Sequence, residues 1–372
     1  MRSWCYFLVA LLFCLPLGRL SAQDLEDGSR FVLEKDWVSW KKGIVMPDTV
    51  KKLLVDEDDD FSLAKLAEFK NLRGLVLSDH ELADLGWLAQ FPKLKVLELS
   101  GNGLRSLEGI QALKSLEEFS ISSNFISNLT PLDSMQGLKM LKLYDNDIAD
   151  LSGIAHLKNV VNLDVSINPI SSLEPIAHWE HLRSFAAYRC SELHDLRPVF
   201  GWLGLRDLNI SFLDVPDFSL EQLGTLMELV NLRVQGMVKS NRDLGYLKAH
   251  ANLEQLTMGK NDSVTSIDSL WALGNLRYLD IHSNNVSDIS VVRNFPRMVK
   301  VVMYRNHVTD ISPFLSCPEL RALYIHENPI KDYSPVFQMG YLQYLNISAK
   351  AFDATQKQQL QKARREVAIS FM

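Results

Sequence analysis

The sequence predicts an α/β solenoid, a horseshoe-shaped right-handed superhelix with a parallel β-sheet on its concave face. The chain of 372 residues repeats one 22-residue pattern along most of its length, and residues 276–340 hold three successive copies. Each copy opens with alternating apolar residues, the two-residue period of a strand. Later apolar residues lie three apart, as in a 3₁₀ turn. Because one copy cannot bury its apolar side alone, the copies must stack.

The three copies begin at Leu276, Met298 and Leu320, with apolar first, fourth and sixth positions and asparagine at the ninth. This pattern resembles the leucine-rich repeat, L-x-x-L-x-L-x-x-N/C-x-L. The constant length and the Asp310-Ile311 tail are similar to the internalin class of bacterial surface proteins. The resemblance covers about residues 50–349 and implies protein ligands such as a surface receptor, although the family shares a shape and not a chemistry.

Thirteen full repeats and a final strand are expected in residues 50–349, and an asparagine at the ninth position should bond the backbone of neighbouring coils. The repeats across 182–275 are longer, with 23, 24, 24 and 23 residues, and they replace that asparagine in three places. We expect altered curvature or a bulged loop across 205–252, and the sequence leaves open whether this part is functional. The predicted starts are Val50, Leu72, Leu94, Leu116, Leu138, Val160, Leu182, Leu205, Leu229, Leu253, Leu276, Met298, Leu320 and Leu342.

The amino terminus has the composition of a cleaved secretory signal. Residues 1–22 combine Arg2, an apolar run and small residues before the expected cut after Ala22. The alternatives are an uncleaved anchor or a buried core segment, and Phe13 disfavours lipidation at Cys14. We therefore expect a secreted, periplasmic or envelope protein with no transmembrane span after cleavage.

Both ends of a solenoid need a cover, because an open end exposes a sheet edge and raw core. Residues 23–49 lack the repeat and predict an amino-terminal cap with a short amphipathic element near Trp37 and Trp40. Residues 350–372 predict a carboxy-terminal cap, in which Asp353 and Gln356 have the capping-box spacing of a helix start and a short strand follows.

The net charge of the chain argues against certain partners, and the spacing of its cysteines argues against a disulfide bond. The net charge is −6 without basic clusters, which disfavours nucleic acid or anionic lipid as the main partner. Cys190 and Cys317 lie five coils apart, about 24 Å at the strand spacing, so they are predicted free thiols. The acidic run 56–60 lacks the spacing of a calcium loop and predicts a solvated rim.

No catalytic motif is legible, and neither a cofactor nor a metal is expected. The chain lacks a phosphate-binding glycine loop, G-x-S-x-G, H-E-x-x-H and C-x-x-C. His282 and His326 share the seventh position, but Tyr304 separates them by two strand spacings, roughly 9.6 Å. A shared zinc ion would strain the reach of both imidazoles.

The strand surface remains as the candidate site. Tyrosine, phenylalanine and arginine dominate protein interfaces, and an exposed aromatic stripe is costly unless something covers it. The alternative is cross-strand pairing, which stabilises the sheet and binds nothing. The candidate binding residues are Tyr144, Tyr188, Phe212, Arg233, Tyr278, His282, Tyr304, Arg305, Tyr324, His326 and Tyr344.

We therefore predict a non-catalytic, monomeric protein that binds a protein ligand on its concave face. A second hypothesis is a carbohydrate-binding or envelope-scaffolding protein, because tyrosine and tryptophan rings with polar neighbours also suit a glycan. A remote third hypothesis is an enzyme with its site in the irregular repeats near 205–252.

Overall fold

The structure is a computed structural model that describes residues 37–40, 50–55 and 62–372. The predicted signal segment 1–22, most of the predicted cap 23–49 and the acidic run 56–60 lie outside the described residues. The chain forms two compact units, the first containing residues 1–148 and 152–163 and the second residues 149–151 and 164–372.

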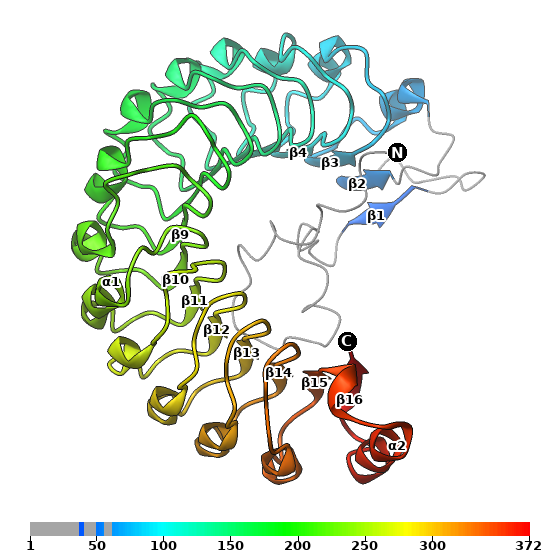
Figure 1. Cartoon of the computed structure of the whole chain (residues 1–372). Helices are drawn as coiled ribbons and strands as arrows, with labels where there is room; N and C mark the ends of the chain where they lie inside the picture. Colours follow the sequence, from blue (N-terminus) through cyan, green and yellow to red (C-terminus); the bar gives the residue numbers. More distant parts are fainter. Residues whose placement is uncertain (1–36, 41–49, 56–61) are drawn as a thin grey trace. The chain divides into compact units, whose positions relative to one another are not determined.

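In the first unit, parallel strands follow one another in chain order, and each is hydrogen-bonded to the next (Figure 1). A 3₁₀ turn joins most successive strands on the other side of the coil, as the three-residue apolar spacing predicts. The strands are β1 (Val38–Ser39), β2 (Lys52–Val55), β3 (Gly74–Leu77), β4 (Val96–Glu98), β5 (Glu118–Ser120) and β6 (Met140–Lys142). The turns are η2 (Leu63–Glu68), η3 (Gly86–Gln90), η4 (Ile110–Ala112), η5 (Thr130–Leu132) and η6 (Ser152–Ile154). Strand β7 (Asn162–Asp164) spans the boundary.

The second unit continues the same arrangement, again with parallel strands in chain order. Its strands are β8 (Ser184–Ala186), β9 (Asp207–Asn209), β10 (Asn231–Arg233), β11 (Gln255–Thr257), β12 (Tyr278–Asp280), β13 (Lys300–Val302), β14 (Ala322–Tyr324), β15 (Tyr344–Ile347) and β16 (Ala368–Phe371). Its helical segments are η7 (Glu174–Ile176), η8 (Arg197–Gly201), η9 (Leu220–Thr225), α1 (Asn241–Leu244), η10 (Gly245–Ala249), η11 (Asp268–Leu270), η12 (Ser290–Asn294), η13 (Ser312–Ser316), η14 (Ser334–Gln338), η15 (Ala349–Ala351) and α2 (Ala354–Ala363).

The core of each coil consists of the apolar repeat positions. Leu276, Leu279 and Ile281, the first, fourth and sixth residues of one repeat, are no more than 1% exposed. Burying one such side chain stabilises the fold by about 1.5–3 kcal/mol. Intervening residues of the strand point to the opposite side, because side chains alternate along a strand. This opposite side is the sheet face discussed below.

The asparagine ladder has the structural role that the sequence predicts. The Asn124 amide donates to the carbonyl oxygens of Leu99 and Ile121 at 3.0 and 2.9 Å. Its Oδ1 accepts from the backbone N–H groups of Asn102 and Leu104 at 3.1 and 2.9 Å. One buried side chain therefore satisfies these four backbone groups, three of which belong to the preceding coil.

The longer repeats place their extra residues in helical turns and leave the sheet regular. Strands β9, β10 and β11 keep a one-to-one register. The additional length is taken up by η9, which starts with a capping box of Ser219 and Gln222, and by the successive segments α1 and η10. Where Met237 replaces asparagine, its own backbone N–H donates to the Val234 oxygen at 3.1 Å. Beside Leu213, the Phe212 N–H keeps the bond to the Gln235 oxygen, at 2.8 Å, that regular coils also make. The added residues of 205–252 therefore lie in longer connections between strands of regular register, and the altered curvature stays a prediction.

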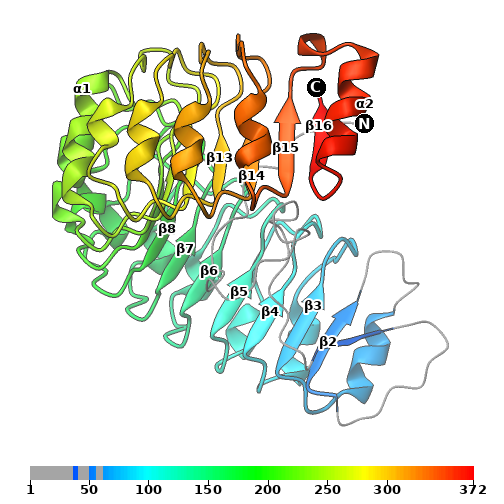
Figure 2. The ribbon, with the colours of Figure 1, turned by 90° about the horizontal axis from the view of Figure 1, so that it is seen from below.

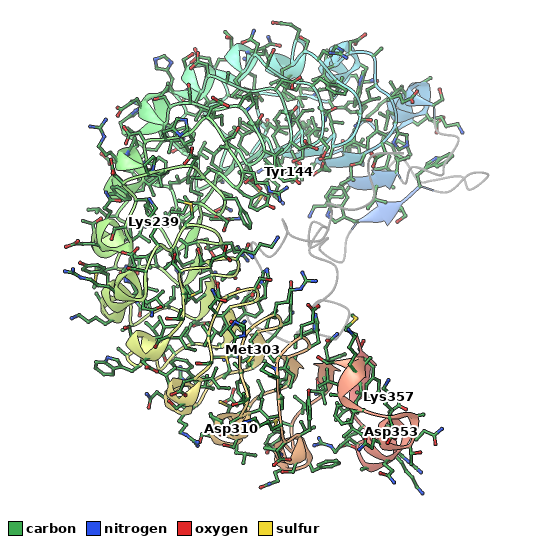
Figure 3. All side chains as sticks on the ribbon, viewed as in Figure 1. Tyr144, Lys239, Met303, Asp310, Asp353 and Lys357 are labelled. Carbon is green, nitrogen blue, oxygen red and sulfur yellow. The ribbon has the colours of Figure 1, made fainter. Side chains whose placement is uncertain are left out.

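Both ends of the described chain carry an added strand. Val38 in β1 pairs with Leu53 in β2, and Trp40 is 4% exposed, so the amino-terminal element near the tryptophans is a strand. Helix α2 begins at the predicted N-cap Asp353, which forms the capping box with Gln356 (Figure 3). Strand β16 follows and pairs with β15, beside which it lies in Figure 2. The predicted helix and strand are thus both present.

Candidate functional site

Three rings stack on the sheet face of the second unit, one from each of three successive coils. The imidazole of His282 lies 4.8 Å from the Tyr304 ring at 21°, and Tyr304 lies 4.5 Å from the His326 imidazole at 12°. All three occupy the seventh repeat position, so the regular strand spacing aligns them. We call His282, Tyr304 and His326 the ring stack. Tyr304 and His326 are half-buried, whereas His282 is 6% exposed.

A glycine makes room for the first ring of the stack. Gly259 holds the seventh position of the preceding coil, and a Cβ built there would lie 2.4 Å from Nδ1 of His282. The same nitrogen lies 2.6 Å from Oδ1 of Asp280, which also accepts from the His282 backbone N–H at 3.0 Å. Both side chains are buried, so the carboxylate fixes the orientation of the imidazole.

A lysine lies between two tyrosines in the adjacent rows of the sheet face. The Lys300 ammonium is 5.4 Å from the Tyr278 ring centroid and 5.2 Å from that of Tyr324. Both distances suit a cation–π interaction. Burial, together with the negative charge of Asp280, raises the pKa of Tyr278 well above its ordinary value. The hydroxyl of Tyr278 therefore stays protonated and remains a hydrogen-bond donor at neutral pH.

A second aromatic cluster lies several coils earlier. The rings of Tyr188 and Phe212 meet edge to face with centroids 5.6 Å apart. The Arg189 guanidinium lies 5.2 Å from the first centroid and 5.5 Å from the second, and the Lys260 ammonium lies 5.5 Å from Phe212. The cations and the rings are thus neighbours across the end of the strands.

The rim beside the ring stack is charged. Nε of Arg305 donates to Oε2 of Glu327 at 2.8 Å, and both side chains are exposed. Burial lowers the pKa of His326, while the nearby Asn346 side chain and the Glu327 carboxylate oppose that shift. His326 is therefore mainly neutral at neutral pH.

Arg233 is the most enclosed cation of this face, at 9% exposed. Burial lowers its pKa, and the surrounding Tyr278, Asp207 and Asp280 counteract this effect. Burial also raises the pKa of Asp207, against a side-chain hydrogen bond from Asn231. Arg233 is consequently part of a packed polar network in the sheet face.

The structure sorts the predicted site residues by exposure. Tyr188, Arg233 and His282 are buried, at 7%, 9% and 6% exposed, and Arg305 is exposed. The others are half-buried: Tyr144, Phe212, Tyr278, Tyr304, Tyr324, His326 and Tyr344. Tyr144 belongs to the first unit, where Figure 3 labels it, and is described apart from the rest. The expected stripe is therefore a set of packed rings with exposed edges.

Three further residues shape this face and were not predicted from the sequence: Gly259, Asp280 and Lys300. Their signal was available, because all occupy the third, fifth or seventh positions that were already assigned to the face. Aromatic residues and arginine stand out at these positions, whereas a glycine matters only through the space that it leaves for a neighbouring ring. Within the described ranges, no group of three or more His, Cys, Asp or Glu side chains is placed to hold a metal ion.

The two cysteines are buried free thiols, as predicted. Sγ of Cys190 takes the ladder position and donates to the Val165 oxygen at 3.3 Å. Burial raises the pKa of Cys190 to about 12 and that of Cys317 to about 11. Both therefore remain protonated at neutral pH and behave as small core residues.

Comparison with known proteins identifies the fold. The model of the family described as leucine-rich repeats (2 copies) matches residues 92–134. An internalin (inlF) from Listeria monocytogenes has a similar structure, with 22% identity, a TM-score of 0.62 and coverage of 75% of this chain and 81% of that one. The chain has the leucine-rich repeat fold. The predicted fold class and the likeness to internalins are thereby confirmed.

Two further solved structures share this leucine-rich repeat fold. A leucine-rich repeat protein from Leptospira interrogans has 19% identity and a TM-score of 0.65, with coverage of 87% of this chain and 90% of that one. The plant peptide hormone receptor RGFR1 in complex with RGF2 has 19% identity and a TM-score of 0.52, with coverage of 81% and 52%. A search of curated protein sequences gives no match. In the described part of the chain, no helix is long and apolar enough to cross a membrane.

Proposed function

We propose that this leucine-rich repeat protein binds a protein ligand on the sheet face of its second unit and does so without catalysis. The observation that carries the proposal is the ring stack of His282, Tyr304 and His326. Its rings lie on a rigid sheet, so a ligand would meet side chains that are already ordered. The plant receptor of the same fold, which is in complex with RGF2, supports protein binding by this scaffold.

The composition around the stack favours a protein partner. Half-buried tyrosines present a rigid ring that ends in a hydroxyl, the type most frequent at interface hot spots. Exposed Arg305 and Glu327 form a charged rim beside them, as in interfaces with an apolar centre and a polar edge. Pairing of side chains between neighbouring strands would by itself explain why the rings stack. It would not require the exposed edges of these rings to match a ligand.

The location we propose is outside the cytoplasm, either secreted or in the periplasm or envelope. Residues 1–22 carry the composition of a secretory signal. The similar internalin supports a bacterial protein of this kind. We also propose that the chain acts as a monomer, because the predicted site lies within one chain.

The test is a pull-down from host-cell and same-species surface extracts with the chain 23–372. A variant carrying Tyr278→Ala, Tyr304→Ala and Tyr324→Ala should lose a partner that the unmodified chain retains. Tyr341→Ala is the matched control, because this tyrosine is 69% exposed and lies outside the sheet face. Equal retention by both variants, with equal circular dichroism spectra, would place the binding surface elsewhere.

A glycan ligand is the second candidate. The Tyr188 and Phe212 rings meet edge to face, and the Arg189 guanidinium and the Lys260 ammonium lie beside them. An aromatic platform with flanking hydrogen-bonding groups suits a sugar. Binding on a glycan array that Phe212→Ala abolishes, without a protein partner in the pull-down, would favour this candidate.

A further inference from the structure

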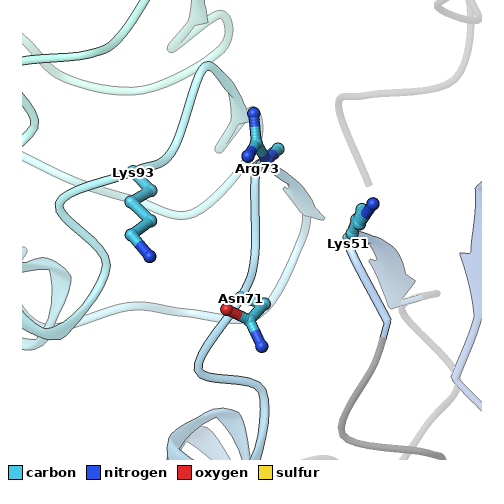
Figure 4. Close-up of a pocket in the computed structure, with 4 residues that line it drawn as sticks. All are labelled: Lys51, Asn71, Arg73 and Lys93. Carbon is cyan, nitrogen blue, oxygen red and sulfur yellow. The ribbon is translucent and has the colours of Figure 1, made fainter.

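We propose that a recess in the first unit binds a phosphate group. The recess has a volume of about 160 Å³ and is lined by Lys51, Asn71, Arg73 and Lys93 (Figure 4). This is roughly ten times the ~10–15 Å³ that one water molecule needs. The recess belongs to the first unit, so it is independent of the proposed protein-binding face of the second unit.

The repeat itself brings the four residues together. Lys51 and Arg73 hold the second position of successive repeats, and Asn71 and Lys93 hold the last position of the same repeats. The Arg73 N–H donates to the Lys51 oxygen at 2.7 Å, which fixes the two backbones side by side. Strands lie about 4.8 Å apart, and like charges on neighbouring strands repel each other. A bound anion would relieve this repulsion.

The recess lacks the counter-charge that the same row of side chains has further along. Lys95 and Lys139 also hold second positions, and both pair with Glu117 between them, at 2.5 and 2.7 Å. Hydrogen bonds from the two lysines lower the pKa of Glu117 to about 2. Among the described residues, no carboxylate lines the recess, and neither Lys51, Arg73 nor Lys93 makes an ion pair. In the part of the chain that the structure describes, three positive charges thus gather without a carboxylate partner, although the whole chain has a net charge of −6.

The chemistry of the lining selects a phosphate. A guanidinium presents a planar fork that binds two oxygens of one phosphate, and ammonium groups act as point charges around it. The Asn71 amide can donate a further hydrogen bond. A phosphate with up to two negative charges balances three cations better than a single carboxylate does. The group could come from inorganic phosphate or from the headgroup of an anionic phospholipid.

Two probes distinguish these sources. Inorganic phosphate is titrated calorimetrically, and flotation is measured with vesicles of phosphatidylglycerol and phosphatidylcholine against vesicles of phosphatidylcholine alone. Low ionic strength is required because exposed charges are screened by salt. Phosphate binding in the titration identifies a free-phosphate site, and binding only to the anionic vesicles identifies a headgroup site.

The deciding variant carries Lys51→Gln, Arg73→Gln and Lys93→Gln, which should weaken the observed binding at least tenfold. The control carries Arg293→Gln, Arg321→Gln and Lys331→Gln, three exposed cations of the second unit with the same loss of charge. The control should bind as the unmodified chain does. Arg73→Gln alone gives the answer if the triple variant fails to fold. Absence of binding to both probes, or equal binding by the two triple variants, would overturn the proposal.

Discussion

The Asp280 carboxylate lies 2.6 Å from Nδ1 of His282, and both side chains are buried in the sheet face. The pair orients the first ring of the stack. We expect Asp280→Asn to lower the free energy of unfolding by about 1–3 kcal/mol, because hydrogen bonds to a buried charged group are lost or weakened. Urea unfolding measures the effect. Asp268→Asn, at an exposed turn, is the control, and an equal loss in both variants would contradict the role of the pair.

A methyl group at residue 259 should disturb the same ring. Gly259→Ala places a Cβ about 2.4 Å from His282 Nδ1, so the imidazole must move. We expect destabilisation of about 1–3 kcal/mol, as for other overpacked sites. Gly274→Ala is the matched control, because its Cβ has no neighbour closer than 3.9 Å. Equal urea midpoints for the two variants would show that the contact does not matter.

The asparagine ladder should contribute much of the stability of a coil. Asn124→Ala removes an acceptor for two backbone N–H groups and a donor to two carbonyl oxygens. Leaving such groups unsatisfied costs about 1–3 kcal/mol each, so we expect a loss of at least about 2 kcal/mol. Asn159→Ala removes an exposed amide and should change the unfolding midpoint little. A similar loss for both would contradict the ladder model.

The stability of the chain should depend on pH through His326. Burial lowers the pKa of this imidazole in the folded chain below the ordinary value of 6.5. The unfolded chain therefore binds the proton more readily, and stability falls as the pH drops below about 6.5 and through the lowered pKa. Thermal unfolding at pH 7.5 and 5.5 should show a smaller drop for His326→Gln than for the unmodified chain. His307→Gln, at an exposed position, should not reduce the drop.

The fold could be predicted in detail from the sequence because every repeat carries the same spacing of apolar residues. The starts from Val50 to Leu342 each lead into a strand, from β2 to β15, and the cap helix begins at Asp353 as expected. Apolar spacing and capping are local signals, so they can be read without a structure. The additional strand β1 was not predicted, because two residues beside Trp37 and Trp40 carry no period.

The site was harder to predict, because the exposure of a side chain on the sheet face depends on how the side chains of neighbouring coils pack against it. Tyr188 and His282 hold surface positions of their strands, yet the structure buries both. His282 is covered because Gly259 leaves room for its ring and Tyr304 stacks on it. A position in the repeat fixes the side of the sheet, whereas the packing on that side depends on three coils at once.

The eighth position of the repeat has the same backbone conformation whatever residue occupies it. Residues as different as Ile167, Arg189, Phe212 and Glu327 all have φ between 51° and 58° there. A left-handed backbone costs most for β-branched residues, yet isoleucine is accommodated because the coil above and below fixes the turn. The side chain at the eighth position can therefore change without changing the backbone conformation on which the fold depends. The scaffold can exchange the chemistry it presents, one coil at a time, without being redesigned.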